Sequence, residues 1–464
     1  MSAASEPERV DLVVTGGDVL TMNARREVLA GGAVALGGGR VVELGSSAEL
    51  LARHPTAETL DARGCIVAPG LVNTHQHLTG DPLVQGCIPD TIDTDTSIYG
   101  WAVPIHAAHE PVDDEIAAAL EALRCLRAGT TTIVEAGTVA HPDRVAVGID
   151  SVGARATLGQ WGWDVEGVPF GGTVDEVLDR QRELVGRHPA GRRVEGWVTL
   201  VGHSMASDEL LVGASGLARE LGVGMTMHLS PTSSDPDDYL ERTGRRPVEH
   251  LAELGVLGPH LLLAHAVWLD DREVELVLEH DVAIAYCPWA YLRLGQGVTV
   301  AGRHAEIVEA GGRIGLGCDA ANAADHHDIR RTAALAAGLA RDMRLRPDRF
   351  GAHDAFALAT IGGAAAMGAA DRIGSLEPGK QADLVVFEPD GLEHRPEGDP
   401  VLALVWGTTR ARDVVVAGEV VVRGGRSTMV DEEALVAEAV ERRRHLLARA
   451  GITPRSAWPV IEAG

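Results

Sequence analysis

The chain has 464 residues, of which 45% are hydrophobic and 23% are charged, and its formal net charge is −26. This balance is typical of a globular protein, and the length suits a barrel of about 250 to 350 residues with an accessory part. The acidic surplus argues against a nucleic-acid partner, because phosphate binding needs a basic surface. No run approaches the ~20 apolar residues of a membrane helix. Five scattered cysteines without CxxC spacing indicate neither disulfides nor a thiolate zinc site, so we expect a cytoplasmic protein.

Short strands joined by glycine turns are expected at both chain ends. Near the N-terminus, apolar runs at 12–14, 19–21, 33–36 and 41–44 are separated by Gly16-Gly17 and by Gly37-Gly38-Gly39. Similar short apolar runs occur again at 383–387, 414–416 and 420–422. We therefore expect a small β-sandwich built from residues 1–66 and 373–464. A terminal helix should pack on the body, because apolar residues repeat at helical spacing: Leu435, Val436, Ala439, Val440, Leu446 and Leu447.

Between these ends, over residues 67–372, apolar runs alternate with helical patterns, which is typical of parallel βα units. The first candidate strand ends before His75. Seven others follow at 131–135, 155–160, 196–203, 222–228, 261–265, 282–287 and 313–319. Eight is the number of strands that closes a (β/α)8 barrel. The predicted fold class is therefore α/β: a TIM barrel with a small β-sandwich domain formed from both chain ends.

A His-x-His pair, His75 and His77, ends the first of these strands. Side chains at positions i and i+2 of a strand point to the same side, so both imidazoles can reach one metal ion. Three later strands end in His228, His265 and Asp319. Because catalytic residues of a barrel come from the C-terminal ends of its strands, these side chains should converge at one mouth. The pattern predicts a metal site.

The segments around these residues resemble the amidohydrolase superfamily, in particular the branch of triazine hydrolases, guanine deaminases and methylthioadenosine/S-adenosylhomocysteine deaminases. They are PGLVNTHQH, GTTTIVEAG, LLLAHAVWLDDREVELV, AYCPWAYLRLGQG, GLGCD and IGSLEPGKQADLVVF, and the resemblance covers nearly the whole chain. It implies that His75, His77, His228 and Asp319 bind a metal ion, with His265 at the edge as a ligand or a partner of the bound water. It also implies a homodimer or a larger homo-oligomer.

The expected cofactor is one divalent metal ion, zinc or iron. An ion with an open position lowers the pKa of its bound water toward about 7. Asp319 would then act as general base and proton carrier, and His265 would steady the attacking oxygen. One subgroup of the superfamily uses two metals bridged by a carboxylated lysine. Lys380, the only lysine, falls in a turn of the expected sandwich, so a mononuclear site is favoured.

The sequence departs from the deaminase branch at Pro231. In that branch a glutamate follows the strand-five histidine by three residues and carries protons to the ring nitrogen and the departing amine. Proline can do neither. Candidate substitutes are Glu135 and His203 at strand ends, and three aspartates on the next loop: Asp235, Asp237 and Asp238. Alternatively the substrate needs less proton transfer, as in the opening of a cyclic amide or imidazolone ring.

Several residues are expected to contact the substrate. The aromatic candidates for stacking on a planar ring are Trp101, Trp161, Trp163, Trp289 and Tyr291. The last loop offers Asn322, Asp325, His326 and His327 for polar edges, although the two histidines are favoured as a surface pair. Residues 78–110, which include His106 and His109, are expected to cover the mouth.

Together these features predict a mononuclear metal-dependent hydrolase that acts on a small nitrogen heterocycle, by hydrolytic deamination or a related displacement at an amidine-like carbon. The alternative is a hydrolase that opens a cyclic amide or imidazolone ring. A third reading is a metal-holding binding protein that lost turnover together with the glutamate. Neither a nucleic acid nor a membrane is expected as a partner.

Overall fold

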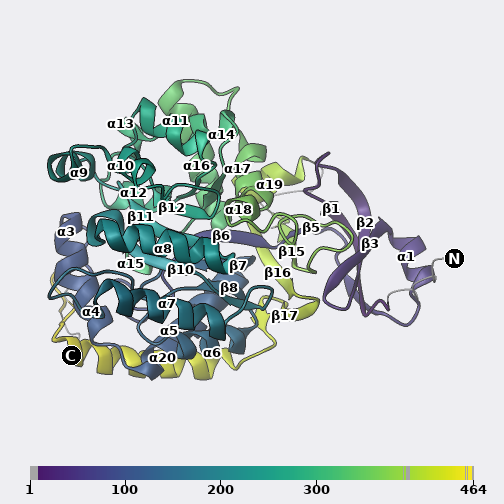
Figure 1. The fold of residues 1–464 in the computed structure, drawn as a ribbon. Helices are drawn as coiled ribbons and strands as arrows, with labels where there is room; N and C mark the ends of the chain where they lie inside the picture. Colours follow the sequence, from purple (N-terminus) through teal and green to yellow (C-terminus); the bar gives the residue numbers. More distant parts are fainter. Residues whose placement is uncertain (1–8, 390, 393–397, 455, 457, 462–464) are drawn as a thin grey trace.

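The computed structural model describes the whole chain except residues 1–8, 390, 393–397, 455, 457 and 462–464. Parts of the expected terminal regions 1–66 and 373–464 therefore lie outside the described residues. Figure 1 shows a body in which helices surround parallel strands, and beside it a lobe of strands that includes the N-terminal part of the chain.

Both chain ends contribute to one mixed sheet of nine strands, in the order β18-β17-β16-β15-β5-β1-β2-β3, with β4 paired to β1. The strands are β1 (Leu12–Leu20), β2 (Val28–Gly37), β3 (Arg40–Ser46), β4 (Glu58–Asp61), β5 (Ile66–Pro69), β15 (Leu384–Pro389), β16 (Thr409–Val416), β17 (Glu419–Arg423) and β18 (Arg426–Ser427). The two ends of the chain meet where β5 pairs with β15 in antiparallel register. Strand pairing thus gives one continuous sheet, separate from the other strands, where we expected a small sandwich.

Gly16 and Gly17 do not form the expected turn between two strands. Strand β1 continues through them, with Thr15 opposite Ala33 and Gly17 opposite Gly32, and the register shifts on both sides of Gly17. Gly16 has a φ of 81°, a conformation that glycine adopts without the steric cost of a side chain. The pair therefore forms an irregularity of the β-bulge kind inside one strand.

The body contains parallel strands at all eight expected positions, and its α/β character is confirmed. They are β6 (Leu71–Gln76), β7 (Thr130–Glu135), β8 (Arg155–Leu158), the pair β9 (Val194–Gly196) and β10 (Val198–Gly202), β11 (Met225–Leu229), β12 (Leu261–His265), β13 (Ala283–Tyr286) and β14 (Ile314–Leu316). Strands β6 to β9 form one sheet and β10 to β14 another. Only Trp197 separates β9 from β10, and a parallel bridge between Gln76 and Asp319 brings the end of β6 beside the residues that follow β14.

The helices lie between and around these strands. They are α1 (Ser47–Arg53), α2 (Asp81–Val84), α3 (Thr94–Ser97), the π-helix η1 (Ile98–Ala102), α4 (Val103–Ala107), α5 (Pro111–Arg127), α6 (Pro142–Val152), α7 (Val174–Arg187), the 3-10 helix η2 (His203–Met205), α8 (Asp208–Leu221), α9 (Asp235–Thr243), α10 (Pro247–Glu253), α11 (Asp271–Glu279), α12 (Pro288–Arg293), α13 (Val298–Ala301), α14 (His304–Glu309), α15 (Ala321–Ala324), α16 (Ile329–Arg344), α17 (Ala352–Leu358), α18 (Ile361–Ala366), α19 (Pro400–Trp406) and α20 (Glu432–Ala450). Local sequence sets their starts. In α11, for example, Asp270 and Glu273 each accept a hydrogen bond from the other's backbone N–H.

Helix α20 is the terminal helix expected from the apolar spacing, and it packs against α5 and α2. Ala439, Leu446 and Leu447 form its buried side. Val436 and Val440, which we expected there, are 52% and 63% exposed. The contacting stripe is therefore narrower than the apolar pattern suggested.

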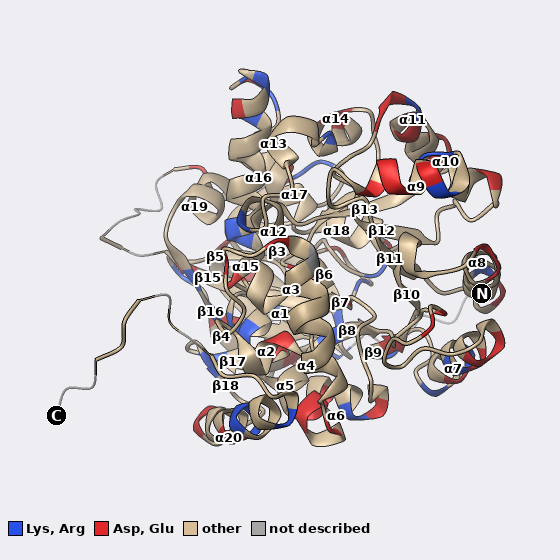
Figure 2. Cartoon of the chain, turned by 90° about the vertical axis from the view of Figure 1, so that its left-hand side faces the viewer, with Lys and Arg blue, Asp and Glu red and all other residues tan. Residues whose placement is uncertain are grey.

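Charged residues concentrate on the outer helices, as Figure 2 shows for α7, α11 and α20, whereas the largest core cluster joins apolar residues of strands and helices throughout the body. All five cysteines are free and buried. Within the described part of the chain, no helix is both long and apolar enough to cross a membrane.

Candidate active site

Four imidazoles and one carboxylate meet at the C-terminal ends of the parallel strands. His75 and His77 lie at the end of β6, while His228 and His265 lie in β11 and β12. The ring centroid of His75 is 5.2 Å from that of His77, 4.9 Å from that of His228 and 5.3 Å from that of His265. Asp319 Oδ1 lies 3.3 Å from His77 Nε2 and 3.6 Å from His75 Nε2. The strand-end pattern of the sequence thus corresponds to a real cluster.

The nitrogen atoms of this cluster are suited to a metal ion. Both ring nitrogens of His75 and Nδ1 of His265 are buried without a hydrogen-bond partner among the described residues, an arrangement that costs about 1 to 3 kcal/mol per atom if nothing binds there. The possible ligand atoms of His75, His77 and His228 lie within 4.8 Å of one another, as do those of His75, His265 and Asp319. Imidazole nitrogen with one carboxylate is a donor set that zinc favours.

Two of these histidines are oriented by hydrogen bonds from their other ring nitrogen. His77 Nδ1 is 2.8 Å from Thr138 Oγ1, and His228 Nδ1 donates to the carbonyl oxygen of Val201. The carbonyl contact fixes the tautomer of His228, so that its Nε2 keeps its lone pair for an ion, and the Thr138 contact holds the ring of His77 in place.

His265 and Asp319 both have a left-handed backbone, with φ values of 78° and 65°. This conformation is uncommon for residues with a side chain and costs of order 1 to 3 kcal/mol. Asp319 is held in place by its backbone N–H, which donates to the carbonyl of His75 at 2.9 Å, and by its Oδ1, which accepts from Ala320 N at 2.7 Å. The strain therefore coincides with the convergent cluster.

Electrostatics leave Asp319 and His265 in the protonation states that a metal site needs. Burial alone would raise the pKa of Asp319, but the neighbouring imidazoles of His75 and His77 hold it well below the usual value. Burial lowers the pKa of His265 to about 3. At neutral pH Asp319 is therefore an anion and His265 is an uncharged imidazole.

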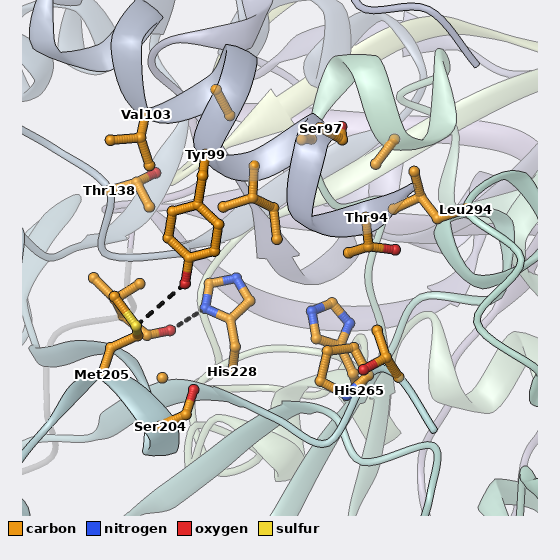
Figure 3. A pocket seen from close by; sticks show the side chains of 18 of the residues that line it. Thr94, Ser97, Tyr99, Val103, Thr138, Ser204, Met205, His228, His265 and Leu294 are labelled. Carbon is orange, nitrogen blue, oxygen red and sulfur yellow. Dashed lines mark hydrogen bonds between the residues drawn. The ribbon is translucent and has the colours of Figure 1, made fainter. Parts of the chain in front are cut away.

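A cavity of about 510 Å³ opens above this cluster, and His77, His228, His265 and Asp319 contribute to its lining. The segment from α2 to α4, part of the expected cover 78–110, forms one wall. Figure 3 shows Tyr99 of that wall pointing toward Met205, with its hydroxyl 3.3 Å from the Met205 sulfur. This contact joins the wall to η2, so the cavity is bounded by elements that are far apart in the sequence.

The expected aromatic contacts divide into two groups. Trp161 and Trp163 line the cavity, and their rings stack at 4.7 Å. Among the described residues the lining does not include Trp101, Trp289 or Tyr291. Trp101 packs instead in the apolar cluster that includes Ala439 of α20, and Trp289 stands edge-on to His326 at 5.1 Å. The structure therefore places Trp101, Trp289 and Tyr291 outside the cavity lining, and Trp161 and Trp163 within it.

The candidate replacements for the missing glutamate differ in position. Pro231 itself lines the cavity, as do His203, Asp235 and Asp238. Glu135 is fully buried, and within the described chain it is absent from the lining. Its Oε2 accepts from Gly137 N at 2.7 Å, and burial raises its pKa to about 7. Asp237 is exposed.

His203 has one ring nitrogen free beside the cavity. Its Nδ1 lies 3.3 Å from the carbonyl oxygen of His228, so Nδ1 carries the hydrogen, whereas Nε2 has no partner among the described residues. Burial lowers the pKa of His203 to about 4. At neutral pH His203 therefore presents a hydrogen-bond acceptor to the cavity rather than an acid.

The last loop is tied to the opposite wall rather than left free. Asn322 lines the cavity, but its Nδ2 donates to Asp81 Oδ1 at 3.1 Å and its Oδ1 accepts from Gly86 N at 2.8 Å. His326 is buried and His327 pairs with Glu121, which overturns the expectation of a surface histidine pair. The amide of Asn322 thus links the loop to the α2 segment.

Sequence reasoning missed several lining residues, namely Asp81, Tyr99, Met205 and Gln296. Asp81 is buried, and its burial raises its pKa. All four come from loops or short helices beyond the strand ends. Their position after a predicted strand end was the one available signal, but it does not say which loop residue turns inward.

Comparison with known proteins agrees with this site. A model described as "Amidohydrolase family" matches residues 66–421, and an "Imidazolonepropionase-like composite domain, bacteria" matches residues 32–57. A 5-methylthioadenosine/S-adenosylhomocysteine deaminase from Syntrophobacter fumaroxidans is 30% identical over 94% of this chain and 98% of its own length. An adenosine deaminase from Xanthomonas campestris, solved with bound zinc, superposes with a TM-score of 0.89 at 27% identity, covering 96% of this chain and 100% of that one. An atrazine chlorohydrolase from Arthrobacter aurescens, complexed with zinc, gives 0.84 at 25% identity, covering 93% and 100%.

Proposed function

The chain belongs to the amidohydrolase family, and we propose that it uses one divalent ion, zinc or iron, to remove an amino group from a small, purine-like nitrogen heterocycle. The observation that carries this proposal is the convergence of His75, His77, His228, His265 and Asp319 at the cavity. The names of its relatives, which are deaminases of adenosine derivatives, support the choice of reaction and ring.

The proposed architecture is a closed (β/α)8 barrel over the expected region 67–372, except that residues 67–69 complete β5 of the terminal sheet. The rest of that sheet is drawn from 1–66 and 373–464. The closed barrel is supported by the Gln76–Asp319 bridge between the first and last strand ends and by the single residue that separates β9 from β10. A homodimer or larger assembly is also proposed, on the family resemblance, and sedimentation of the purified protein tests it.

In the proposed reaction the ion, when bound, supplies Lewis acidity and hydroxide at neutral pH. Asp319, an anion at neutral pH, accepts the proton of the attacking water and passes it to the departing nitrogen. His265, uncharged, orients the attacking oxygen. His203 presents its Nε2 lone pair to an N–H of the substrate, and the stacked pair Trp161 and Trp163 forms an apolar part of the cavity wall beside a planar ring. The chain thus contributes positioning and one proton carrier.

Ring opening of a cyclic amide is the second candidate, and one observation favours it. Pro231 occupies the cavity wall where the deaminase branch has its acid, Glu135 lies off that wall, and His203 offers a lone pair. A cyclic amide needs only one proton at its leaving nitrogen, which Asp319 can deliver. Glu135→Gln and His203→Gln should then be mild, whereas a deaminase with a relocated acid loses roughly 10²- to 10⁴-fold in rate.

Product analysis decides between these reactions. Zinc-loaded protein is incubated with 5'-methylthioadenosine and with a cyclic imidazolone, and ammonia and product mass are measured. We expect ammonia and the exchange of an amino group for oxygen. A net gain of one water without ammonia would favour ring opening, and substrate that is bound but unchanged would leave only the binding-protein reading.

A further inference from the structure

Gln296 has an unused amide at the cavity. The residue lines the cavity, is only 6% exposed, and its Oε1 is buried without a hydrogen-bond partner among the described residues. A buried amide oxygen left in this state costs about 1 to 3 kcal/mol. Such an orphan in a binding cavity calls for a partner that is not part of the chain.

The backbone of Gln296 is fixed on both sides, so the amide does not belong to a loose loop. Its N–H donates to the carbonyl of Tyr291 at 2.8 Å, and its carbonyl accepts from Trp268 Nε1 at 2.7 Å. Gly295 and Gly297 flank it with φ values of 66° and 82°. A Cβ on Gly297 would lie 2.6 Å from the Trp268 ring, so the tight approach to that ring requires glycine.

Two other buried glutamines, Gln181 and Gln76, use their side-chain amides inside the protein. Gln181 Nε2 donates to the carbonyls of Gln160 and Thr199, and its Oε1 accepts from Thr199 N. Gln76 Nε2 donates to Glu121, while its Oε1 accepts from Asn73. Both amides are thus satisfied structurally. Gln296 differs because its amide is held at the cavity and used by nothing else in the described chain.

A side-chain amide offers one donor beside one acceptor, the arrangement with which Asn and Gln read adenine through N6 and N7. We propose that Gln296 binds the edge of the heterocycle on which the exocyclic amino group lies beside a ring nitrogen. Oε1 accepts from the amino group, and Nε2 donates to the ring nitrogen. This inference rests on the proposed function and specifies its substrate: a ring that retains a ring-nitrogen acceptor next to the amino donor.

Binding of ring analogues tests the assignment without turnover. Dissociation constants are measured by rapid-mixing tryptophan fluorescence, before the amino group is released, for 5'-methylthioadenosine and its 1-deaza, 3-deaza and 7-deaza forms, with wild type, Gln296→Met and Gln381→Met. Gln381 is a half-buried glutamine beside the terminal sheet and serves as the control. Wild type should bind the 1-deaza or the 7-deaza form about tenfold more weakly than the parent, because one hydrogen bond is lost.

Gln296→Met should bind the parent about tenfold more weakly and no longer distinguish that analogue, with zinc content and urea midpoint unchanged. Its response to the 3-deaza form should stay as in wild type, because N3 has no amino group beside it. If Gln296→Met does not fold, Gln296→Glu, which keeps the length but not the donor, replaces it.

The assignment is overturned if Gln296→Met binds the parent as tightly as wild type does, or if it keeps both the 1-deaza and the 7-deaza penalties. It also fails if none of the four ligands binds wild type. Ammonia release is scored separately: wild type that binds with the expected pattern but releases no ammonia would refute deamination while leaving the edge assignment intact.

Discussion

Individual side chains at the cluster are held by costly local arrangements. Neither ring nitrogen of His75 has a hydrogen-bond partner in the described part of the chain, and Asp319 holds its carboxylate beside His75 and His77 from a left-handed backbone. Both costs are offset when an ion binds all of these groups at once. The unpaired ring nitrogens and the strained backbone are therefore the features that a bound ion would compensate.

Replacing His75 by alanine tests this at the level of one residue. Wild type should carry close to one zinc or iron per chain, and His75→Ala should lose both metal and activity, because His75 belongs to both ligand groups of the cluster. Elemental analysis with a turnover assay checks it. Two ions per wild-type chain, or full metal content in the variant, would contradict the mononuclear site.

His304 makes the stability of the protein depend on pH. Burial lowers its pKa to about 4, its Nε2 is 2.7 Å from the His265 carbonyl, and its ring stacks on Tyr286 at 4.0 Å. In the unfolded chain the pKa of a histidine is near 6.5, so between about pH 6.5 and pH 4 the unfolded state binds a proton at His304 that the folded state does not. The buried, uncharged His304 therefore contributes its full stabilisation above about pH 6.5, and this stabilisation is lost as pH falls toward 4.

Glutamine at position 304 cannot titrate but can still donate to that carbonyl. We therefore expect the free energy of unfolding to fall less in His304→Gln than in wild type when the pH drops from about 7.5 to about 5, and the difference should be about 2 kcal/mol. Urea unfolding at the two pH values measures this difference. Equal losses in the two proteins would show that His304 is not the group that titrates.

The positions of individual side chains could be predicted from the sequence where strand geometry determined them. His75, His77, His228, His265 and Asp319 had to converge if parallel strands ended together, and they do. Trp101 and Trp289 could not be placed this way, because they lie in helical segments whose inward face depends on packing with distant partners such as α20. Gln296 follows a predicted strand end, but the sequence does not single it out from its neighbours, and only its unpaired amide oxygen distinguishes it.

At the scale of elements, helix α20 reaches from the C-terminus to the wall of the cavity. Arg443 donates to the carbonyls of Leu83 and Gln85 at 3.2 and 3.0 Å, and it contacts the Cys87 sulfur at 3.0 Å. These residues continue from α2, whose Asp81 lines the cavity. The terminal helix thus braces a segment that bounds the proposed substrate site.

Loss of this brace should alter substrate binding more than chemistry. We expect Arg443→Ala to raise KM several-fold, with metal content unchanged and kcat changed less, because the wall loosens while the cluster stays intact. Arg444→Ala on the same helix is the matched control, since Arg444 is 73% exposed and pairs with Glu441. Steady-state kinetics would contradict the idea if both variants behaved alike.

Strands were predicted better than the turns between them. All of the parallel strands lie where apolar runs predicted them, because such runs need no knowledge of distant partners. Gly16-Gly17 resembled a turn because glycine is permissive in turns and in bulges alike, and only pairing with β2 shows that β1 continues. Val436 and Val440 fit the helical period but face outward.

For the whole molecule, a buried ion pair joins the terminal sheet to the body. Arg155 of β8 meets Asp383, just before β15, through contacts of 2.9 and 3.2 Å, and the side chains are 9% and 4% exposed. Asp383 also accepts from Ala417 N at 2.7 Å. Removing one partner of such a pair leaves a buried charge without compensation.

Asp383→Asn should therefore lower the free energy of unfolding by about 3 to 5 kcal/mol. Glu58→Gln, which removes an exposed pair with Arg423, should cost less than about 1 kcal/mol. Urea unfolding measures both. A loss below about 1 kcal/mol in Asp383→Asn would mean that the pair does not couple the sheet to the body.

The pairing of β5 with β15 also determines when the terminal sheet can be completed during synthesis of the chain. Strand β5 leaves the ribosome roughly 300 residues before its partner, which at about 5 to 20 residues per second is a wait of roughly 15 to 60 s. Throughout that interval one edge of β5 has unpaired main-chain groups, the kind of edge on which chains aggregate. The strand is only 4 residues long, which limits this exposure. A ribosome stalled before residue 384 would therefore hold a chain whose terminal sheet cannot yet close.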